Sequence, residues 1–489
     1  DTCTVRFSMW MEAGLPADDQ NTRAQARPAT GIVHLGLGAF FRAFGCVYIA
    51  DAMAASGGNW GIVGVSLRSP DTRDALSASD WSYTSVSLAP EGDKLREIAV
   101  LNDVLVAPEN PKAVIAAMVD PAVKIVTLTV TEKGYCHNPA TGELNLDHPD
   151  IRHDLAHDLP VSALGYLVRA LAARHVAGVA PFTVLTCDNL PENGKLVRGL
   201  LLELAAWIDP ALANWIATEG RFPSTMVDRI TPATTGADIA RIATLTGVVD
   251  AAPVMHESFS QWAVEDNFVN GVRPDLEAAG VEMVRDVTAH EQMKLRMLNG
   301  THSALAYAGY LAGHDTIADT MADPVFADYV RALWVEIMPT VTAPEGVSLT
   351  AYAEALFDRY ANPAIRHRTW QIAMDGSQKL PQRILSTLHE NLAEGRKTDG
   401  LCVALAAWMR YVSGMDEAGQ PIDVRDPLAD RLRNLAAGQD TPADVVTAIL
   451  SVEDIFPADL ADQLRGPVSK AAEKIWSNGV RATVQGVTS

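Results

Sequence analysis

The sequence predicts an α/β fold, with a mainly parallel sheet in its N-terminal part and an all-helical C-terminal part. From about residue 30 to residue 287, short apolar runs alternate with amphipathic helical stretches. Strands that are apolar throughout are typical of a parallel sheet covered by helices on both faces. After residue 287 the apolar positions recur with helical spacing, and no comparable strand runs follow. We therefore expect a lead-in at 1–29, a sheet domain at 30–287 and a helical domain at 288–489.

The expected elements of the sheet domain follow one another as strand and helix. Its strands are predicted from short runs rich in β-branched residues, at 31–38, 60–67, 124–135 and 181–189. Its helices are predicted from apolar residues that recur every three to four positions, at 47–56, 111–120 and 161–178. In the C-terminal part the same spacing predicts helices at 290–313, 323–341, 349–362, 378–395 and 401–414.

Composition narrows the functional classes. The chain of 489 residues carries 39 basic and 60 acidic side chains, a formal net charge of −21, which argues against a nucleic-acid partner. Its five cysteines lie far apart and indicate reduced thiols in a cytoplasm rather than a disulfide framework. We expect no membrane helix and no signal peptide, because no apolar run reaches the roughly 18 residues a span needs. The oligomeric state stays open.

Two glycines after the first predicted strand suggest a nucleotide-binding turn. Gly36 and Gly38 stand where a backbone can approach a pyrophosphate, although the position of a third glycine holds Phe41. Such a Rossmann-like domain usually has an acidic residue after its second strand, and Asp71 is in this place. From sequence alone the glycine pair is common, and Asp71 fits a solvent-facing turn after Pro70 equally well.

Polar clusters also follow later strands, at 129–135, 186–194 and 226–232. In open parallel sheets the carboxyl ends of the strands form the ligand-binding edge. Asp188, Asn189 and Asn193 in the second cluster could equally be turn residues, and Asp228 in the third could pair with Arg229. The twelve histidines show no metal-binding motif and no compact set with cysteine or aspartate, so we expect no metal site.

Three polar residues interrupt the first apolar helix of the C-terminal part. Lys294, Asn299 and His302 are five and three positions apart, and at about 100° per residue they span an arc of about 140° on an α-helix. Leu295 and Leu298 lie in the same arc, so the lysine is expected to be partly buried. A buried ammonium is costly unless it is used or compensated. The alternative is a lysine that reaches solvent beside two satisfied core residues.

Several ordered motifs resemble one family. GIVHLGLGAFFRA, TEKGYC, CDNLPENG, MVDRITP and WAVEDNFVNG, together with the Lys294, Asn299 and His302 spacing, resemble the mannitol 2-dehydrogenase family over residues 30–485. This resemblance implies a Rossmann-like domain, a helical domain and an active site between them. It also implies NAD as cofactor and a polyol or sugar acid as substrate.

The resemblance implies roles for matching positions. Lys294 resembles the general base, Asn189 and Asn299 the pair that stabilises the alkoxide, His302 a substrate-positioning residue and Glu132 part of a proton path. Further implied substrate contacts are Val227, Asp228, Lys379 and Arg368. The implied cofactor contacts are Gly36, Gly38, Phe40, Arg42 and Asp71, with Asp71 favouring NAD over NADP.

Two departures from the family pattern bear on function. Phe41 and Phe44 replace histidines usual in the nucleotide loop, which bears on cofactor affinity. Gln371 stands where mannitol-specific members have arginine, so the segment 366–383 is more similar to the mannonate oxidoreductase (fructuronate reductase) branch. Mannonate and fructuronate are therefore favoured over mannitol and fructose. A catalytically silent NAD-binding sensor is the alternative from another functional class.

A lysine base needs a neutral amine. A free lysine titrates near 10.4, and bringing it to 7–8 destabilises the ammonium by about 4 kcal/mol. Burial beside Leu295 and Leu298, with the nicotinamide cation nearby, could supply this. The segment 366–383 also carries Arg366, Arg368, Lys379 and Arg383. These cations could form a solvated helix face or hold the substrate carboxylate.

Overall fold

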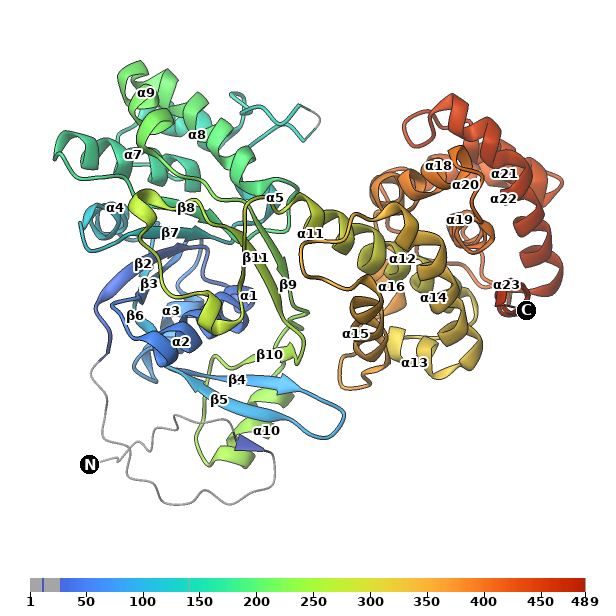
Figure 1. Ribbon diagram of the computed structural model, residues 1–489, viewed down its shortest axis with the longest axis horizontal. Helices are drawn as coiled ribbons and strands as arrows, with labels where there is room; N and C mark the ends of the chain where they lie inside the picture. Colours follow the sequence, from blue (N-terminus) through green and yellow to red (C-terminus); the bar gives the residue numbers. More distant parts are fainter. Residues whose placement is uncertain (1–10, 13–26, 140, 489) are drawn as a thin grey trace. The chain divides into compact units, whose positions relative to one another are not determined.

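The computed structural model describes residues 11–12, 27–139 and 141–488, which form two compact units, Asp1–Thr288 and Ala289–Ser489. Most of the expected lead-in at 1–29 lies outside the described residues. The predicted fold class is confirmed: the first unit contains a parallel sheet flanked by helices, and the second is helical (Figure 1).

A five-stranded parallel sheet forms the centre of the first unit. Its strands lie in the order β6-β3-β2-β7-β8, and every adjacent pair is parallel. The strands are β2 (Thr30–Leu35), β3 (Gly61–Ser66), β6 (Leu101–Val106), β7 (Ile125–Leu128) and β8 (Thr183–Thr186). Their carboxyl ends therefore meet at one edge of the sheet, as the sequence predicts.

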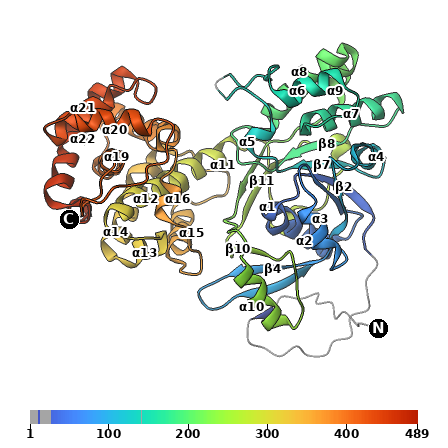
Figure 2. The ribbon, with the colours of Figure 1, turned by 180° about the vertical axis from the view of Figure 1, so that it is seen from behind.

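Helices cover both faces of this sheet (Figures 1 and 2). Side chains alternate in direction along a strand, so Ile32 and Val33 of β2 belong to different apolar cores. Val33 packs with α4 (Pro111–Val119), α7 (Ala163–Val176), α8 (Asn193–Ile208) and α9 (Pro210–Glu219). Ile32 packs with α1 (Ala39–Ala43), α2 (Gly45–Ser56) and α3 (Asp71–Ser77).

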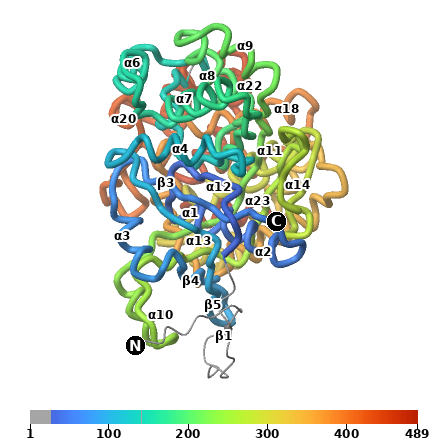
Figure 3. The backbone as a smooth tube through the Cα atoms, turned by 90° about the vertical axis from the view of Figure 1, so that its left-hand side faces the viewer, coloured from blue at the N-terminus to red at the C-terminus, as the bar shows by residue number. Residues whose placement is uncertain are grey.

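Two smaller mixed sheets were not anticipated. One joins β1 (Met11–Glu12), β5 (Lys94–Ile98), β4 (Tyr83–Leu88) and β10 (Val254–Glu257), and α10 (Gly236–Thr246) packs on it. The other joins β12 (Glu282–Val284), β11 (Gln261–Glu265) and β9 (Thr225–Asp228). Figure 3 shows β4, β5 and α10 at one end of this unit and α6 (Pro149–Ala156) to α9 at the other. These strands are short and partly polar, which weakens their signal in the sequence.

Two sequence expectations need correction. The strand expected at 124–135 ends at Leu128, and Thr131–Gly134 forms the short helix α5. One helical stretch, Ala39–Ser56, is long and apolar enough to cross a membrane by length and composition, although no such run was expected. Of this stretch 56% is buried, since it packs on the parallel sheet as α1 and α2. The four cysteines in the described ranges are free, and all four are buried.

The second unit is built around one buried helix, α12 (Thr301–Leu311). Residues 301–309 are all buried, and α13, α14, α16 and α19 surround this helix. In the described part of this unit the helices before α18 are α11 (Thr288–Met293), α13 (Ile317–Ala322), α14 (Pro324–Ile337), α15 (Leu349–Ala361), α16 (Thr369–Ile372) and α17 (Gly376–Leu380). They continue as α18 (Ser386–Ala393), α19 (Asp399–Val412), α20 (Ala429–Ala437), α21 (Pro442–Leu450), α22 (Ala458–Asn478) and α23 (Val480–Thr488).

Two buried histidines in the first unit are held neutral. His34 on β2 bonds to the hydroxyls of Thr127 and Thr129, at 2.7 and 2.9 Å. His256 on β10 bonds to the Ser85 hydroxyl at 2.8 Å and donates to the carbonyl oxygen of Glu257 at 2.7 Å. Burial lowers the pKa of each to about 3.

These histidines predict a loss of stability in acid. Below about pH 6.5 the unfolded chain protonates them while the folded chain does not, so each removes up to about 1.4 kcal/mol per pH unit from the free energy of unfolding. His256→Gln should flatten this decline between about pH 6.5 and pH 4 in urea unfolding. The exposed His175 supplies the control, and equal slopes for His256→Gln and His175→Gln would contradict the prediction.

Candidate active site

The glycine turn after β2 places Gly36 in a backbone conformation that other residues rarely adopt. Gly36 has φ +89°, and a Cβ atom there would overlap the carbonyl oxygen of Thr129, so only glycine fits. Gly38 is the N-cap of α1, and the nearest atom to a Cβ there is 3.9 Å away. The protein itself therefore leaves space beside Gly38. Backbone amides at such a helix start are suited to a phosphate.

The aromatic residues of the nucleotide loop are mainly core residues. Phe41 stacks on His34 with ring centroids 3.4 Å apart, and Phe44 packs against Tyr48 and Trp262. Both side chains are buried, so the two departures from the family pattern contribute to packing. Phe40, by contrast, is only partly buried and stacks on Phe44.

Arg42 has internal partners. Its guanidinium is buried, donates to the carbonyl oxygen of Ala252 at 2.5 Å and lies over the Tyr83 ring. These contacts are structural, so cofactor binding by Arg42 stays a prediction. Asp71 is exposed at the start of α3 and accepts a bond from the Ser69 hydroxyl at 2.9 Å. Because β3 pairs with β2, Asp71 and Gly36 follow neighbouring strands, as a ribose-binding acid would require.

Asp188 links the ends of β7 and β8. Its carboxylate accepts bonds from the backbone amides of Val130 and Thr131, at 2.9 and 3.0 Å, and from the Tyr135 hydroxyl at 2.7 Å. Burial raises the pKa of Asp188, and these three donors oppose that shift. Thr131 has φ +64°, a strained conformation for a β-branched residue. The sequence also fits Asp188 as a turn residue, whereas its carboxylate fixes the start of α5.

The predicted polar residues of the first unit surround this link. Glu132 on α5 and Asn189, which follows Asp188, are both exposed at the carboxyl edge of the sheet. Asn193 is buried and bonds both ways with the backbone of Thr225, so it ties the start of α8 to β9. Val227 and Asp228 end β9, and both are buried.

In the second unit Lys294 opens a π-helix rather than lying on an α-helix. The segment η3 (Lys294–Gly300) separates α11 from α12, so the predicted α-helical arc is wrong here. A π-helix bonds residues five apart. Lys294 and Asn299 are therefore one turn apart on nearly the same face. Lys294 is buried and Asn299 is half-buried.

Side chains satisfy the carbonyl groups that the wider turn disturbs. The carbonyl oxygen of Met297 accepts bonds from Trp334 Nε1 at 3.0 Å and Thr301 Oγ1 at 2.7 Å. That of Leu298 accepts from the Tyr360 hydroxyl at 2.8 Å. Buried carbonyl groups require such partners. Three surrounding side chains therefore stabilise a backbone form that is rare in proteins.

Two further contacts fix η3. The buried guanidinium of Arg296 binds both carboxylate oxygens of Glu390, at 2.9 and 2.5 Å, and the carbonyl oxygen of Thr340. Gly300 faces η5 (Pro381–Leu385), a second π-helix, and a Cβ atom on Gly300 would lie 2.7 Å from the carbonyl oxygen of Arg383. Glycine at 300 therefore permits the two π-helices to approach each other.

Cationic and neutral groups surround His302. Its ring stacks on Tyr360 at 5.3 Å and meets His367 edge-on at 4.8 Å. Burial, and then the electrostatic influence of His367, Arg383, Arg359 and Lys379, hold the pKa of His302 well below its usual value. His302 is therefore neutral and can exchange hydrogen bonds with a hydroxyl group.

The basic residues predicted in 366–383 differ in burial. Arg366 and Arg368 are exposed, as is Gln371, whereas Lys379 and Arg383 are partly buried. Lys379 donates to the carbonyl oxygen of Met374 at 2.6 Å. The structure thus groups Lys379 and Arg383 near His302, while the exposed Arg368 stays a prediction.

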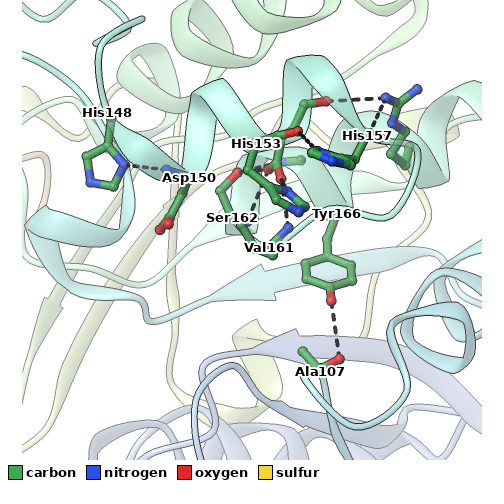
Figure 4. Close-up of polar contacts among 11 residues, drawn as sticks. Ala107, His148, Asp150, His153, His157, Val161, Ser162 and Tyr166 are labelled. Atoms are coloured by element: carbon green, nitrogen blue, oxygen red, sulfur yellow. Dashed lines mark hydrogen bonds and ion pairs between the residues drawn. The ribbon is translucent and has the colours of Figure 1, made fainter.

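The expectation that histidine, cysteine and aspartate form no compact set is wrong. Donor atoms of Cys136, His148 and Asp150 lie within 4.8 Å of one another. The backbone amide of Asp150 donates to His148 Nδ1 at 3.2 Å, in the first turn of α6 (Figure 4). Burial raises the pKa of Cys136 to about 12, and the positive end of a helix disfavours a cation. The absence of a metal stays a prediction.

Comparisons with known proteins agree over nearly the whole chain. Residues 30–278 match the mannitol dehydrogenase Rossmann domain, and residues 286–476 match the mannitol dehydrogenase C-terminal domain. D-mannonate oxidoreductase of Escherichia coli (strain K12) is 44% identical over 468 residues, 94% of this chain and 96% of that protein.

Two solved structures are similar. The D-sorbitol dehydrogenase structure in substrate-free form has a TM-score of 0.88 at 33% identity, covering 94% of this chain and 95% of that one. The ternary complex of Pseudomonas fluorescens mannitol 2-dehydrogenase with NAD and D-mannitol has a TM-score of 0.79 at 37% identity, covering 94% of each chain.

The link made by Asp188 predicts a stability effect. In Asp188→Asn the carboxamide has one acceptor oxygen and no charge, so the backbone amide of Val130 or of Thr131 loses its charged partner. Such a loss lowers the free energy of unfolding by about 1–3 kcal/mol. Asp147→Asn is the control, because Asp147 is exposed and pairs only with Arg152. Urea unfolding measures both variants, and equal stabilities would contradict the role of Asp188.

The close approach of the two π-helices at Gly300 predicts that alanine there destabilises the protein, whereas alanine at an unhindered glycine stabilises it. Gly300→Ala should lower the free energy of unfolding by about 1–3 kcal/mol, because the methyl group overlaps the Arg383 backbone. Gly486→Ala in α23 has no neighbouring atom within 4 Å and should gain up to about 1 kcal/mol from helix propensity. Thermal or urea unfolding distinguishes them, and a stabilising Gly300→Ala would show that the contact is loose.

Proposed function

This chain belongs to the mannitol dehydrogenase family, and from this membership we propose that it is a NAD-dependent oxidoreductase whose favoured pair is mannonate and fructuronate. As a member of this family, the chain is an oxidoreductase that acts on polyols or sugar acids. The reaction interconverts a secondary alcohol and a ketone. The alternative pair within the same family is mannitol and fructose.

One observation carries the proposal: Lys294 and Asn299 are one π-helical turn apart, beside a neutral His302. An amine, an amide and an imidazole are the groups needed to remove a hydroxyl proton, stabilise the oxygen and orient the alcohol. A lysine that only reached for solvent would not require a buried π-turn. This arrangement favours catalysis over the role of a silent NAD-binding sensor.

The residues present fit a dinucleotide. The space beside Gly38, the start of α1 and the acid Asp71 after the neighbouring strand are the features that a pyrophosphate and an adenosine ribose require. NAD supplies hydride transfer chemistry when bound. Gly36, Gly38, Phe40 and Asp71 would hold it, and the carboxylate of Asp71 would repel the additional phosphate of NADP.

The residues of this chain would handle the proton and the developing charge. The amine of Lys294, in its neutral form, accepts the hydroxyl proton as the carbonyl group forms. The amides of Asn299 and Asn189 donate to the substrate oxygen while it carries negative charge, and His302 orients the alcohol. The exposed Glu132 passes the proton onward to solvent, and Val227 and Asp228 contact the substrate chain.

A substrate panel tests the proposal. We expect NADH to form with mannonate, and fructuronate to be reduced with higher kcat/KM than fructose. A preference for mannitol would select the alternative pair. Binding of NADH without turnover of any polyol or sugar acid would instead identify a sensor.

Lys294→Ala should lower kcat at least about 100-fold, because the proton then lacks a positioned base. NADH affinity, measured by fluorescence, should stay within about threefold. Small primary amines should partly restore the rate of this variant. Lys470→Ala, at an exposed position on α22, is the matched control. A Lys294→Ala enzyme with more than about a tenth of the wild-type kcat would exclude lysine as the base.

A further inference from the structure

The structure distinguishes among the three arginines of the segment 366–383. Arg366 and Arg368 are exposed, and Arg368 precedes α16. Arg383 lies on η5, and burial lowers the pKa of its guanidinium. Only Arg383 therefore carries its charge in the interior, on the side of the unit that holds His302.

Arg383 lacks an ion-pair partner in the described part of the chain. Its Nη1 donates to the Ser303 hydroxyl at 3.1 Å, next to His302 on α12. The charge of Arg383 acts on Lys379, which donates a hydrogen bond to the carbonyl oxygen of Met374, and the charges of Asp375 and Asp426 also act on Lys379. Two partly buried cations that repel each other are costly unless an anion joins them.

The groups whose charges act on His302 and Arg383 are histidines, cations and tyrosines. His302 and His367 are neutral, since burial lowers the pKa of each, that of His367 to about 4. His367 Nδ1 is buried and has no hydrogen-bond partner among the described residues. The surroundings of His302 thus combine the positive charge of Arg383 with an unpaired ring nitrogen of His367, which suits a ligand that carries an anion and hydroxyl groups.

We propose that Arg383, with Lys379 beside it, binds the substrate carboxylate and sets the preference for sugar acids over polyols. This proposal rests on the proposed function, because the carboxylate lies at the opposite end of mannonate from the reacting carbon. The backbone of Arg383 touches Gly300 at the end of the π-turn that begins with Lys294. The carboxylate-binding residue and the base are consequently fixed to one rigid pair of turns.

The test compares mannonate with mannitol, which has a hydroxymethyl group in place of the carboxylate. Arg383→Gln should lower kcat/KM for mannonate by about 10- to 150-fold, the effect of one lost charge-assisted hydrogen bond. For mannitol the change should stay within about threefold. Arg366→Gln is the matched control, and it should alter neither value. Arg383→Lys, which retains charge but not the two-pronged donor, should give an intermediate loss.

The outcomes separate this proposal from the one on which it rests. A wild-type enzyme that oxidises neither mannonate nor mannitol would overturn the proposed function itself. If the wild type prefers mannonate, but Arg383→Gln weakens both substrates equally, Arg383 has only a structural role. If Arg368→Gln instead lowers kcat/KM for mannonate alone, the exposed Arg368 binds the substrate carboxylate and the proposal for Arg383 is wrong. Should Arg383→Gln fail to fold, Ser303→Ala, which releases the Arg383 guanidinium, must reduce the mannonate preference or the proposal fails.

Discussion

The contact between Gly300 and the carbonyl group of Arg383 is the constraint on which the second unit's polar arrangement depends. A side chain at 300 would push η3 away from η5, and both segments are π-helices whose broad turns need close neighbours. Trp334, Tyr360 and Thr301 then satisfy the carbonyl groups that the broad turn leaves. Packing thereby holds a conformation that the local sequence alone would not favour.

In the first unit, buried and partly buried polar side chains fix the loops that follow the strands. A parallel sheet brings loops together at its carboxyl edge, but the loops need fixed positions to place a side chain accurately. Asp188 and Asn193 fix the positions of these loops. Asp188 bonds to backbone amides of the turn that follows β7, and Asn193 bonds to a backbone amide of β9. Strained residues occur at these points, with Thr131 at φ +64° and Glu192 at φ +46°. Buried polar groups thus act as the frame, while Glu132 and Asn189 remain exposed.

Much of this arrangement could be predicted from the sequence. The alternation of apolar strands and helices predicts the parallel sheet, because burial on both faces leaves a continuous apolar run. The short mixed sheets were missed, since β4 and β5 are partly polar and their pairing depends on distant partners. The π-turn was missed for a different reason: assuming a regular helix hides the meaning of the five-residue spacing between Lys294 and Asn299. That spacing is one π-turn, and it was the available signal.

Burial distinguishes residues that have the same charge and lie close together in the sequence. Four cations in 366–383 looked alike in the sequence, yet tertiary contacts leave Arg366 and Arg368 in solvent and place Arg383 against Ser303. Cys136, His148 and Asp150 likewise meet only because the chain reverses between 137 and 144. Neither grouping follows from local periodicity.

The π-turn also limits how this chain can change in length. A π-turn is equivalent to an α-helix that has gained one residue, so deleting any residue from 294–300 would allow an ordinary helix to form. Because the wider turn takes up the extra residue, the residues on either side of it would keep nearly the same faces after such a deletion. Lys294 and Asn299 lie among these seven residues, so a deletion at 294–299 would remove one of them or shorten their spacing from five positions to four.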